Sequence, residues 1–447
     1  MWDNHLKRLL VRSMTLAVLW TPGFFHPLIA QEPLTLRKAI ETGLQNNYSI
    51  LIQHNEAEIS RNNNTLGNAG FLPALDLNVT QNTTIANTHQ EQFSGTIKDV
   101  SGAQNRNFNA GVALRWTIFD GLQMFASKKM LNILEDLGEN GTRMVVEGTV
   151  SDIILTYSGM IQLQKMVQVM RDAVDLSLQR KRIAEAKLTF GAGSELMLLQ
   201  STVDLNADST QLISQENSLN NTLVDLNRIL ATDIDTRWEF ADSIQLNDTL
   251  DFGKCLANAL QQNATLISVR LNQAVLRQEV RITQSGRYPR VDLSGGYTYS
   301  TLNSQTGFLQ YNRSYGPSYG ITLSYNLFNG FNLNHAIRNA KIALNSGDLE
   351  TRDAELELRA TLRKLFNQYH VNLEIIRMQV INVRVAQENV NVAFEKYKLG
   401  SLDDIGLREI QNKLIDAQSQ LILSQFEAKK AETEILRLSG FLFQSMK

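Results

Sequence analysis

The sequence predicts a mainly α-helical, duplicated protomer that places four β-strands in a membrane. Two observations predict the duplication and the strands: Pro73 and Pro289 stand 216 residues apart (289 − 73), and alternating apolar and polar residues follow each of them. A third observation predicts very long helices, because no proline occurs from Gly121 to Phe190 or from Gly330 to Leu399.

The balance of charge argues against a nucleic-acid-binding protein. The 447 residues include 43 Lys and Arg against 45 Asp and Glu, so the net charge is −2 and no strong positive field exists. Cys255 is the only cysteine, which excludes a disulfide within the chain and a thiolate metal cluster. We expect this cysteine to be a small apolar core residue.

Residues 1–30 have the pattern of an export signal peptide. Lys7, Arg8 and Arg12 precede the apolar run MTLAVLW, and the small residue Ala30 precedes Gln31. A cytosolic amphipathic start is the alternative. No other segment offers the ~20 apolar residues of a membrane helix, so we expect strands to carry any membrane insertion.

The duplication extends over nearly the whole chain. LTLRKAIETGLQNNYSI matches LDFGKCLANALQQNATL at the offset of 216, which pairs Leu34 with Leu250 and Asn47 with Asn263. GVALRWTIFDG matches GITLSYNLFNG at an offset of 209. The predicted divisions are a first repeat at 31–231, a polar linker at 232–249, a second repeat at 250–440 and a tail at 441–447.

Two β-hairpins are predicted, at 72–119 and 289–328, with long polar loops at 83–107 and 304–316. Apolar side chains occupy alternate positions, so each strand has an apolar face and a polar or small one. Strands of about ten residues suit a tilted membrane crossing. The side chains expected to face lipid are Leu75, Leu77, Val79, Val112, Leu114, Trp116, Val291, Leu293, Ile321, Leu323 and Tyr325.

Four residues are expected to mark the changes between helix and strand. Proline has a fixed φ and no amide hydrogen, so Pro73 and Pro289 suit the first position of a strand after a helix. Gly121 and Gly330 are expected where each hairpin returns to helix.

Membrane hairpins are favoured over two hairpins of a soluble sandwich. The rest of each repeat is helical, so no second sheet is left to bury the apolar faces. Four strands also leave open edges that hydrocarbon does not tolerate, and closed barrels need about eight strands or more. We therefore expect several protomers to close one barrel together.

Each repeat is expected to contain one very long helix, at 121–189 or 330–398, and a shorter returning helix, at 195–231 or 402–439. About 70 helical residues reach roughly 100 Å, several times the thickness of a bilayer core. One stripe of the second long helix predicts coiled-coil packing. It consists of Leu358, Leu362, Leu365, Tyr369, Leu373, Ile376, Val380, Val383, Val390, Phe394 and Tyr397.

In this order and in duplicate, the segments resemble the TolC-type outer-membrane efflux protein family. The resemblance rests on LTLRKAIETGLQNN leading to GFLPALDL, on VALRWTIFDG, and on the turns FGAG and LGS, and it covers residues 34–440. It implies a homotrimer in which three four-stranded sheets form one twelve-stranded transmembrane β-barrel. A long α-helical barrel of coiled coils then crosses the periplasm.

The function that the resemblance implies is a passive duct for drugs, toxins or exported polypeptides. An inner-membrane transporter of the RND, ABC or MFS type supplies the energy, and a periplasmic adaptor (membrane fusion) protein joins the two. The implied location is the bacterial outer membrane and its lipid, with the helices in the periplasm. Drug efflux and type I protein secretion both stay open.

In the family, adaptor hairpins dock at the glycine turns between long and returning helices. The alternative is that these glycines serve only as left-handed turn residues. The corresponding residues in this sequence are Phe190, Gly191, Ala192, Leu399, Gly400 and Ser401.

In the family, a tyrosine–acid–arginine network and an acidic ring close the periplasmic entrance. Tyr397 falls on the tyrosine position and Glu409 on one ring-acid position. Leu402, Gly406 and Met197 occupy the positions of the arginine, the other ring acid and the acid of the first repeat, so most of that network is absent or relocated.

Nearby charged residues are candidates to replace the missing ones, namely Asp403, Asp404, Arg408 and Glu195. A ring of carboxylates at a narrow pore selects for cations. The alternative is a solvated, charged first turn, because Asp403 and Asp404 also suit a helix N-terminus.

Other classes of function fit less well. The chain contains no HExxH, GxSxG, GxxxxGK[ST] or paired Cys–His spacing, so no enzyme, metal site or cofactor is predicted. A secreted coiled-coil scaffold or adhesin would account for the helices, but it leaves the four amphipathic strands without a role.

Overall fold

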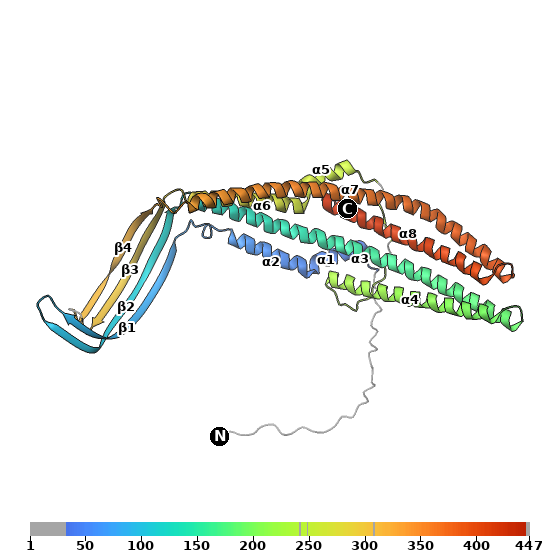
Figure 1. The fold of residues 1–447 in the computed structure, drawn as a ribbon, viewed down its shortest axis with the longest axis horizontal. Helices are drawn as coiled ribbons and strands as arrows, with labels where there is room; N and C mark the ends of the chain where they lie inside the picture. The colour runs from blue at the N-terminus through green and yellow to red at the C-terminus, as the bar shows by residue number, and fades with distance from the viewer. Residues whose placement is uncertain (1–32, 241–242, 248, 307–308, 444–447) are drawn as a thin grey trace, which may run out of the picture.

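The computed structural model describes residues 33–240, 243–247, 249–306 and 309–443, so the predicted signal peptide lies outside it. The molecule is elongated, with a four-stranded antiparallel sheet at one end and a long array of helices at the other (Figure 1). The elements are α1 (Leu36–Asn46), α2 (Tyr48–Asn63), β1 (Ala74–Glu91), β2 (Ile97–Phe119), α3 (Gln123–Thr189), α4 (Glu195–Leu230), α5 (Phe252–Gln262), α6 (Ala264–Ser285), β3 (Arg290–Ser304), β4 (Tyr311–Ser324), α7 (Asn332–Lys398) and α8 (Asp404–Ser439).

Two helices, α3 and α7, run the full length of the array and have 67 residues each. At 1.5 Å per residue, each extends about 100 Å. The returning helices α4 and α8 pack against their far halves, whereas α2 and α6 pack along the halves nearer the sheet (Figure 1). Two shorter helices therefore cover each long helix end to end.

The predicted switch residues lie at the four junctions between helix and strand. Pro73 and Pro289 immediately precede β1 and β3. Gly121 and Gly330 precede α3 and α7 with φ of +70° and +66°, a region that glycine enters without strain. A Cβ at Gly121 would also lie 2.4 Å from the carbonyl oxygen of Ser285, so only glycine fits there.

The sheet has the order β1-β2-β3-β4, so β1 and β4 are its edges. Its register aligns residues of like polarity in rows across the strands. Two rows on the apolar face are Leu77–Val112–Tyr297 and Trp116–Leu293–Ile321, and a row on the polar face is Thr80–Asn109–Ser300–Ser314. The side chains predicted to face lipid share the apolar face, except that Tyr325 follows the end of β4.

The strands are longer than predicted, and the expected polar loops are largely wrong. β1 and β2 contain 18 and 23 residues and continue through most of 83–107. β3 and β4 likewise continue into 304–316, but β4 ends at Ser324 rather than at 328. The prediction followed the apolar alternation, whereas the backbone ladder continues beyond it with polar side chains on both faces.

The predicted stripe of α7 lies mostly in the interface with neighbouring helices. Leu362, Tyr369 and Tyr397 are at most 1% exposed. Val380 is an exception, because it is 53% exposed. Cys255 is buried beside Phe366 and Tyr369 of α7 in an apolar cluster, as the core assignment of this cysteine predicted.

Asn47 and Asn263, which match each other in the two repeats, have the same structural role. Each accepts backbone N–H bonds at the start of the helix that follows it, α2 or α6. Their amide groups also donate to the carbonyls of Ile229 (2.8 Å) and Leu438 (3.1 Å), near the ends of α4 and α8. One asparagine in each repeat thus fixes where the short helices meet the returning helix.

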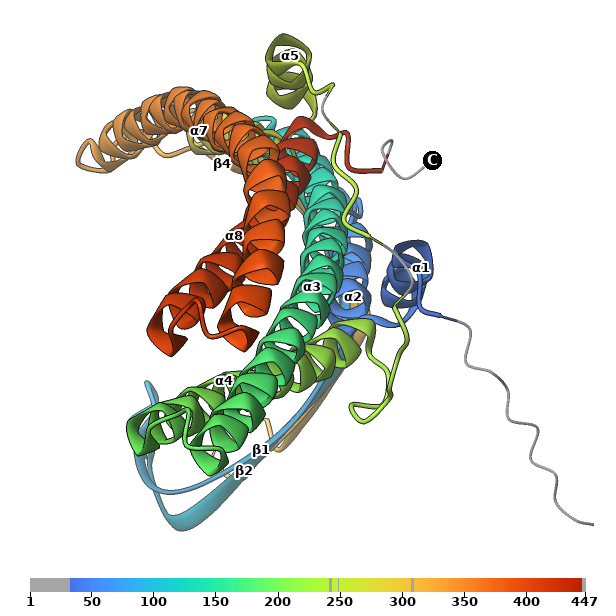
Figure 2. The same cartoon turned by 90° about the vertical axis from the view of Figure 1, so that its right-hand side faces the viewer.

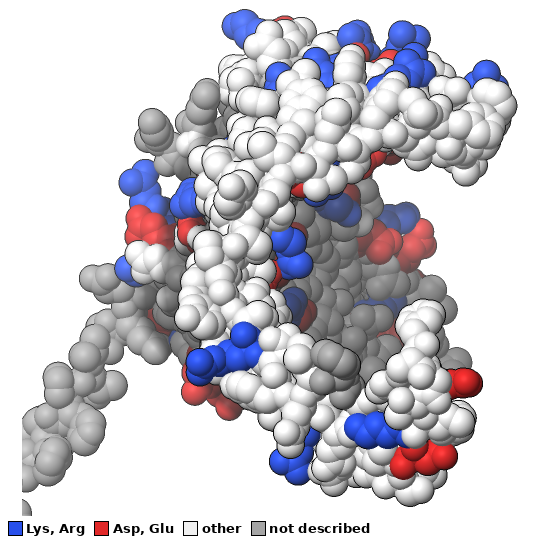
Figure 3. Space-filling model, turned by 90° about the vertical axis from the view of Figure 1, so that its left-hand side faces the viewer, with Lys and Arg blue, Asp and Glu red and all other residues white. Residues whose placement is uncertain are grey.

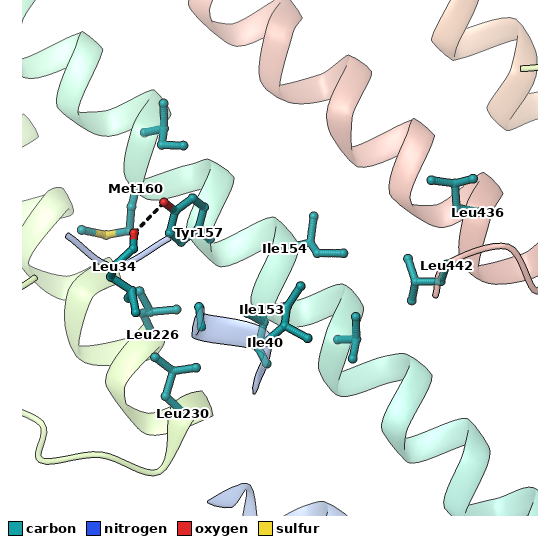
Figure 4. Close-up of a cluster of buried hydrophobic side chains, with 13 residues drawn as sticks. Leu34, Ile40, Ile153, Ile154, Tyr157, Met160, Leu226, Leu230, Leu436 and Leu442 are labelled. Atoms are coloured by element: carbon teal, nitrogen blue, oxygen red, sulfur yellow. Dashed lines mark hydrogen bonds between the residues drawn. The ribbon is translucent and has the colours of Figure 1, made fainter. Parts of the chain in front are cut away.

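The largest core cluster lies midway along α3 and includes Ile153, Tyr157 and Leu226 (Figure 4). The Tyr157 hydroxyl donates to the Leu34 carbonyl at 2.7 Å. Phe240, in the linker expected at 232–249, packs edge-on against the Tyr157 ring with centroids 5.4 Å apart. The linker therefore contributes apolar side chains to the core, although its composition is mostly polar.

One apolar window within α3 is long enough to cross a membrane, which corrects the expectation that no such segment exists. The protein buries 61% of this window in its own interior. Its apolar character is explained by the core cluster around Ile153 and Tyr157.

Viewed along the long axis, the helices form a curved wall with α1 and α5 on its convex side (Figure 2). The space-filling view from the sheet end shows the concave side hollowed, with acidic and basic side chains inside it (Figure 3). The wall of one protomer is therefore an open arc.

Candidate functional site

The two turns at the far end of the helices have the same backbone geometry. Gly191 and Gly400 have φ of +71° and +77°. The N–H groups of Ala192 and Ser401 each donate to the carbonyl five residues earlier, at 2.8 and 2.9 Å. This pattern is a Schellman turn, which requires the left-handed conformation that glycine adopts most easily. The FGAG and LGS segments therefore end their helices in the same way.

Each turn carries one large apolar side chain that the protomer does not cover. Phe190 is 85% exposed and Leu399 is 82% exposed. A Cβ on either turn glycine would meet no atom within 4 Å, so the space around the tips is open. The six residues predicted to dock an adaptor thus form two similar exposed tips, of sequence Phe-Gly-Ala and Leu-Gly-Ser.

A buried ion-pair network lies just behind the tips and joins α3, α4 and α8. Arg180 of α3 is completely buried and donates to Asp404 of α8 at 2.7 Å and 3.3 Å. The same guanidinium also donates to Asp204 of α4 at 3.1 Å. A buried arginine is stable only when carboxylates and other acceptors satisfy it, as they do here.

A second arginine continues the network. Arg408 of α8 makes two hydrogen bonds to Asp208 of α4, at 2.7 and 2.8 Å. Ser177 of α3 donates to the same carboxylate, and Gln411 of α8 donates to the Ser177 hydroxyl at 3.1 Å. Burial lowers the pKa of Arg408, but its bonds to Asp208 and the nearby carboxylates outweigh this effect and raise the pKa.

Tyr397 lies beside this network on α7 and is fully buried. Lys187 of α3 lies over its ring, 4.3 Å from the centroid, and donates to the Tyr397 carbonyl at 2.9 Å. Burial, followed by the charge of Asp404, raises the pKa of Tyr397 to about 12. No hydrogen bond of ordinary geometry joins its hydroxyl to a described residue, although Asp404 lies close enough to raise its pKa.

The other predicted gate residues are exposed and separate from the network. Asp403 caps α8 by accepting from the Gly406 N–H at 2.9 Å. Glu409 pairs with Lys413 at 2.7 Å, and this hydrogen bond lowers the pKa of Glu409. Glu195 is exposed in the first turn of α4. The structure thus brings together Tyr397, Asp404 and Arg408, and it leaves the other three acids at the surface.

The sequence analysis missed Ser177, Arg180, Asp204, Asp208 and Gln411. The signal was present in the three–four spacing of the buried α3 residues Ala173, Ser177, Arg180 and Ala184. A charged residue within a helix-packing stripe of small residues indicates a buried partner on a neighbouring helix. The described residues contain no group of three or more His, Cys, Asp or Glu side chains arranged to hold a metal ion.

Comparison with known proteins shows similarity to outer-membrane export proteins. Residues 255–440 match the family model "Outer membrane efflux protein". The alkaline protease secretion protein AprF of Pseudomonas aeruginosa is 21% identical over 444 residues, which cover 96% of this chain and 90% of AprF. The outer membrane protein TolC of Vibrio cholerae is 22% identical over 176 residues, covering 38% of this chain and 40% of that protein.

The chain resembles the outer-membrane efflux protein family, whose model matches its second repeat.

A solved structure of an outer membrane channel has the same fold. The CmeC channel of Campylobacter jejuni superposes with a TM-score of 0.74 at 13% identity, over 98% of this chain and 94% of CmeC. The chain therefore has the fold of this channel. Its similarity to outer-membrane proteins supports a location in the outer membrane, with the helices extending into the periplasm. The sheet lies at the membrane end, and the glycine turns lie at the periplasmic end.

Proposed function

We propose that this protein is a homotrimeric duct that passively conducts exported molecules from an inner-membrane transporter and its periplasmic adaptor to the cell exterior. One observation carries the proposal. The protomer is a complete arc of four strands and paired helices, yet both of its lateral edges are unfinished. Three such arcs supply twelve strands, enough for a closed barrel.

The edges of the arc are apolar as well as open. β1 and β4 have unpaired backbone groups on their outer sides, which hydrocarbon does not tolerate. The edge helices α2, α4 and α7 expose large apolar side chains that a neighbouring protomer would bury. These include Ile52 and Ile59 of α2, Leu199, Val203 and Ile213 of α4, and Ile342, Leu349 and Met378 of α7.

Of the two proposed kinds of export, the comparisons favour polypeptide secretion over drug efflux. AprF, a protease secretion protein, aligns with nearly the whole chain, whereas the TolC relative aligns with less than half of it. A type I secretion duct would take an unfolded polypeptide as its substrate. Drug efflux through the same conduit is the alternative.

The two periplasmic tips are proposed as the docking points of the adaptor. Phe190 and Leu399 are exposed apolar side chains on rigid Schellman turns, and the turns have the same form in both repeats. Three protomers would therefore present six similar tips in a ring. An adaptor hairpin that buries these side chains gains the hydrophobic free energy that the isolated protomer lacks.

The entrance of the duct is proposed to be controlled where α8 meets α3 and α4. Arg180 and Arg408 hold α8 against the first repeat through Asp404 and Asp208. The exposed acids Asp403, Glu195 and Glu409, of which Glu409 pairs with Lys413 in solvent, are proposed to form a cation-selective ring, whereas Asp404 is buried and neutralised by Arg180.

Conductance across planar phospholipid bilayers tests the proposal. The purified protein should need detergent, run as a trimer and form cation-preferring pores. Because carboxylates near the pore attract cations, combined Asp403→Asn, Glu409→Gln and Glu195→Gln substitutions should lower the cation preference, whereas the distant Glu58→Gln should not. A water-soluble monomer without pores would refute the duct, and unchanged selectivity would refute only the acidic ring.

A further inference from the structure

A cavity of about 570 Å³ lies where the sheet meets the helices, between the start of α3 and the end of α6. Its volume falls within the range of about 300–1,000 Å³ that is typical of small-molecule sites. Both apolar and basic side chains line it. Six of the lining residues are Leu122, Phe125 and Lys129 of the α3 segment and Arg281, Arg287 and Tyr288 of the α6 segment.

The cavity lining is positive and contains no acidic residue. Arg281 donates to the amide oxygen of Gln278 at 3.2 Å, and Arg287 donates to that of Asn334 at 3.4 Å, so both contacts are to neutral groups. Neither arginine nor Lys129 forms an ion pair within the part of the chain that the structure describes. Three uncompensated cations around one cavity favour an anionic ligand.

A chain of aromatic contacts links the cavity to the apolar face of the sheet. The Trp116 indole, on that face, donates to the Phe71 carbonyl at 2.8 Å. The Phe71 ring packs edge-on against Phe125 with centroids 5.0 Å apart, and Phe125 lines the cavity. Aromatic side chains at the end of membrane strands mark the membrane–water boundary, so the three cations lie at the level of lipid headgroups.

Lateral assembly leaves this cavity uncovered. β2 and β3 are the inner strands of the sheet, and α3 and α6 pack against each other between α2 and α7. Neighbouring subunits would meet the edges of the arc, not its middle.

The cluster of cations is specific to this groove. At the repeat offset of 216, Arg281 and Arg287 correspond to Thr65 and Phe71, which carry no charge. Lys129 corresponds to Arg338 at the offset of 209. The positions that match the three cations in the other repeat therefore carry one cation instead of three, so the duplication by itself does not explain the cluster.

We propose that this cavity binds an anionic phospholipid of the periplasmic leaflet. The headgroup phosphate binds Lys129, Arg281 and Arg287, and the acyl chains lie along Leu122, Phe125 and the apolar face of the sheet. The proposal rests on the outer-membrane location of the protein but not on duct activity. Bound lipid would anchor the point at which the membrane strands continue into the periplasmic helices.

Native mass spectrometry of the detergent-solubilised protein, titrated with phosphatidylglycerol, tests the proposal. The variant combines Lys129→Gln, Arg281→Gln and Arg287→Gln. Its matched control combines Arg338→Gln, Lys341→Gln and Arg352→Gln, which removes three exposed cations from α7. Because each cation near a headgroup contributes about fivefold in affinity, the cavity variant should bind phosphatidylglycerol at least about tenfold more weakly than wild type and the control.

Three outcomes would overturn the proposal. Equal loss in both variants would indicate a general effect of charge, and equal binding of phosphatidylethanolamine would show that the anionic headgroup is not recognised. Full competition by inorganic phosphate would indicate a site for a free anion rather than for lipid. Circular dichroism and bilayer conductance of the cavity variant check that it folds and that the duct still works.

Discussion

At the scale of single residues, several side chains near the tips have contacts that differ from the roles predicted for them from the sequence. Asp403 and Asp404 are adjacent and chemically identical, yet Asp403 caps α8 in solvent while Asp404 is buried against Arg180. Tyr397 matches a gate tyrosine by sequence, yet its hydroxyl lacks a hydrogen bond of ordinary geometry to any described residue. Packing of the Tyr397 ring therefore accounts for its contribution better than its hydroxyl group does.

Two substitutions of Tyr397 distinguish the contribution of its ring to stability from that of its hydroxyl group. Tyr397→Phe removes a buried hydroxyl without an ordinary partner, so the free energy of unfolding should change by less than about 1 kcal/mol. Tyr397→Ala removes the ring beneath Lys187 and should cost about 3–5 kcal/mol. Chemical unfolding in detergent at pH 7 measures both variants, and an equal loss for the two would contradict this account.

The same tyrosine should not make the protein sensitive to pH in the physiological range. Its pKa is raised from an ordinary 10.0 to about 12, so the folded state favours the neutral form. The stability gained from this shift is complete below pH 10 and is lost only as the pH rises through about 12.

At the scale of the elements, buried charges join the two coiled-coil pairs near the tips, beside an apolar cluster that includes Ile183 of α3, Tyr397 of α7 and Leu407 of α8. Arg180 and Arg408 connect α8 to α3 and α4 through Asp204, Asp208 and Asp404. A buried pair is costly to break from one side, because the remaining charge is left without a partner. Movement of α8 away from α3 would therefore have to exchange these bonds for water or for another partner.

Removing one arginine tests this connection. Arg180→Met leaves Asp404 and Asp204 with fewer partners, so unfolding should become easier by about 3–5 kcal/mol and bilayer conductance should rise as α8 loosens. The control is Arg171→Met, which removes an exposed pair with Glu216 (side chains 56% and 41% exposed) and should cost less than about 1 kcal/mol. Wild-type conductance in Arg180→Met would show that the network does not hold the entrance.

At the scale of the whole molecule, polarity follows the side of the sheet in the half of the strands nearest the helices. Neighbouring residues of one strand meet opposite environments, since Val112 shares a row with Leu77 and Tyr297 while Ala113 shares a row with Asp76 and Gly296. In the proposed barrel the first row faces lipid and the second faces the water-filled interior.

An arginine scanned across this pair of positions tests the orientation of the sheet. Val112→Arg should cost about 2–4 kcal/mol, because it moves a charge into lipid. Ala113→Arg places the same side chain next to Asp76 on the other face and should be tolerated. The measurement is the yield of folded oligomer in phospholipid vesicles, and a greater loss for Ala113→Arg would reverse the assignment of the two faces.

The sequence by itself determined the parts of this protein that depend on local periodicity. The alternation after Pro73 and Pro289, the proline-free runs and the glycine turns act through neighbouring residues, so they predicted the strands, the long helices and the tips. Only the tertiary structure decided the partners of buried charges. Arg180 and Asp404 are 224 residues apart, and nothing near either residue specifies the other.

Contacts between distant segments also explain why the sequence underestimated the length of the strands and why it did not predict the cation cavity. Backbone pairing of β1 with β2 continues wherever the partner strand is present, whatever the side chains, so the apolar pattern underestimated its extent. Lys129 and Arg281 lie at separate places in the sequence, and the packing of α3 against α6 makes them one site. Contacts between distant segments depend on how the helices and strands dock, which periodicity along the chain does not encode.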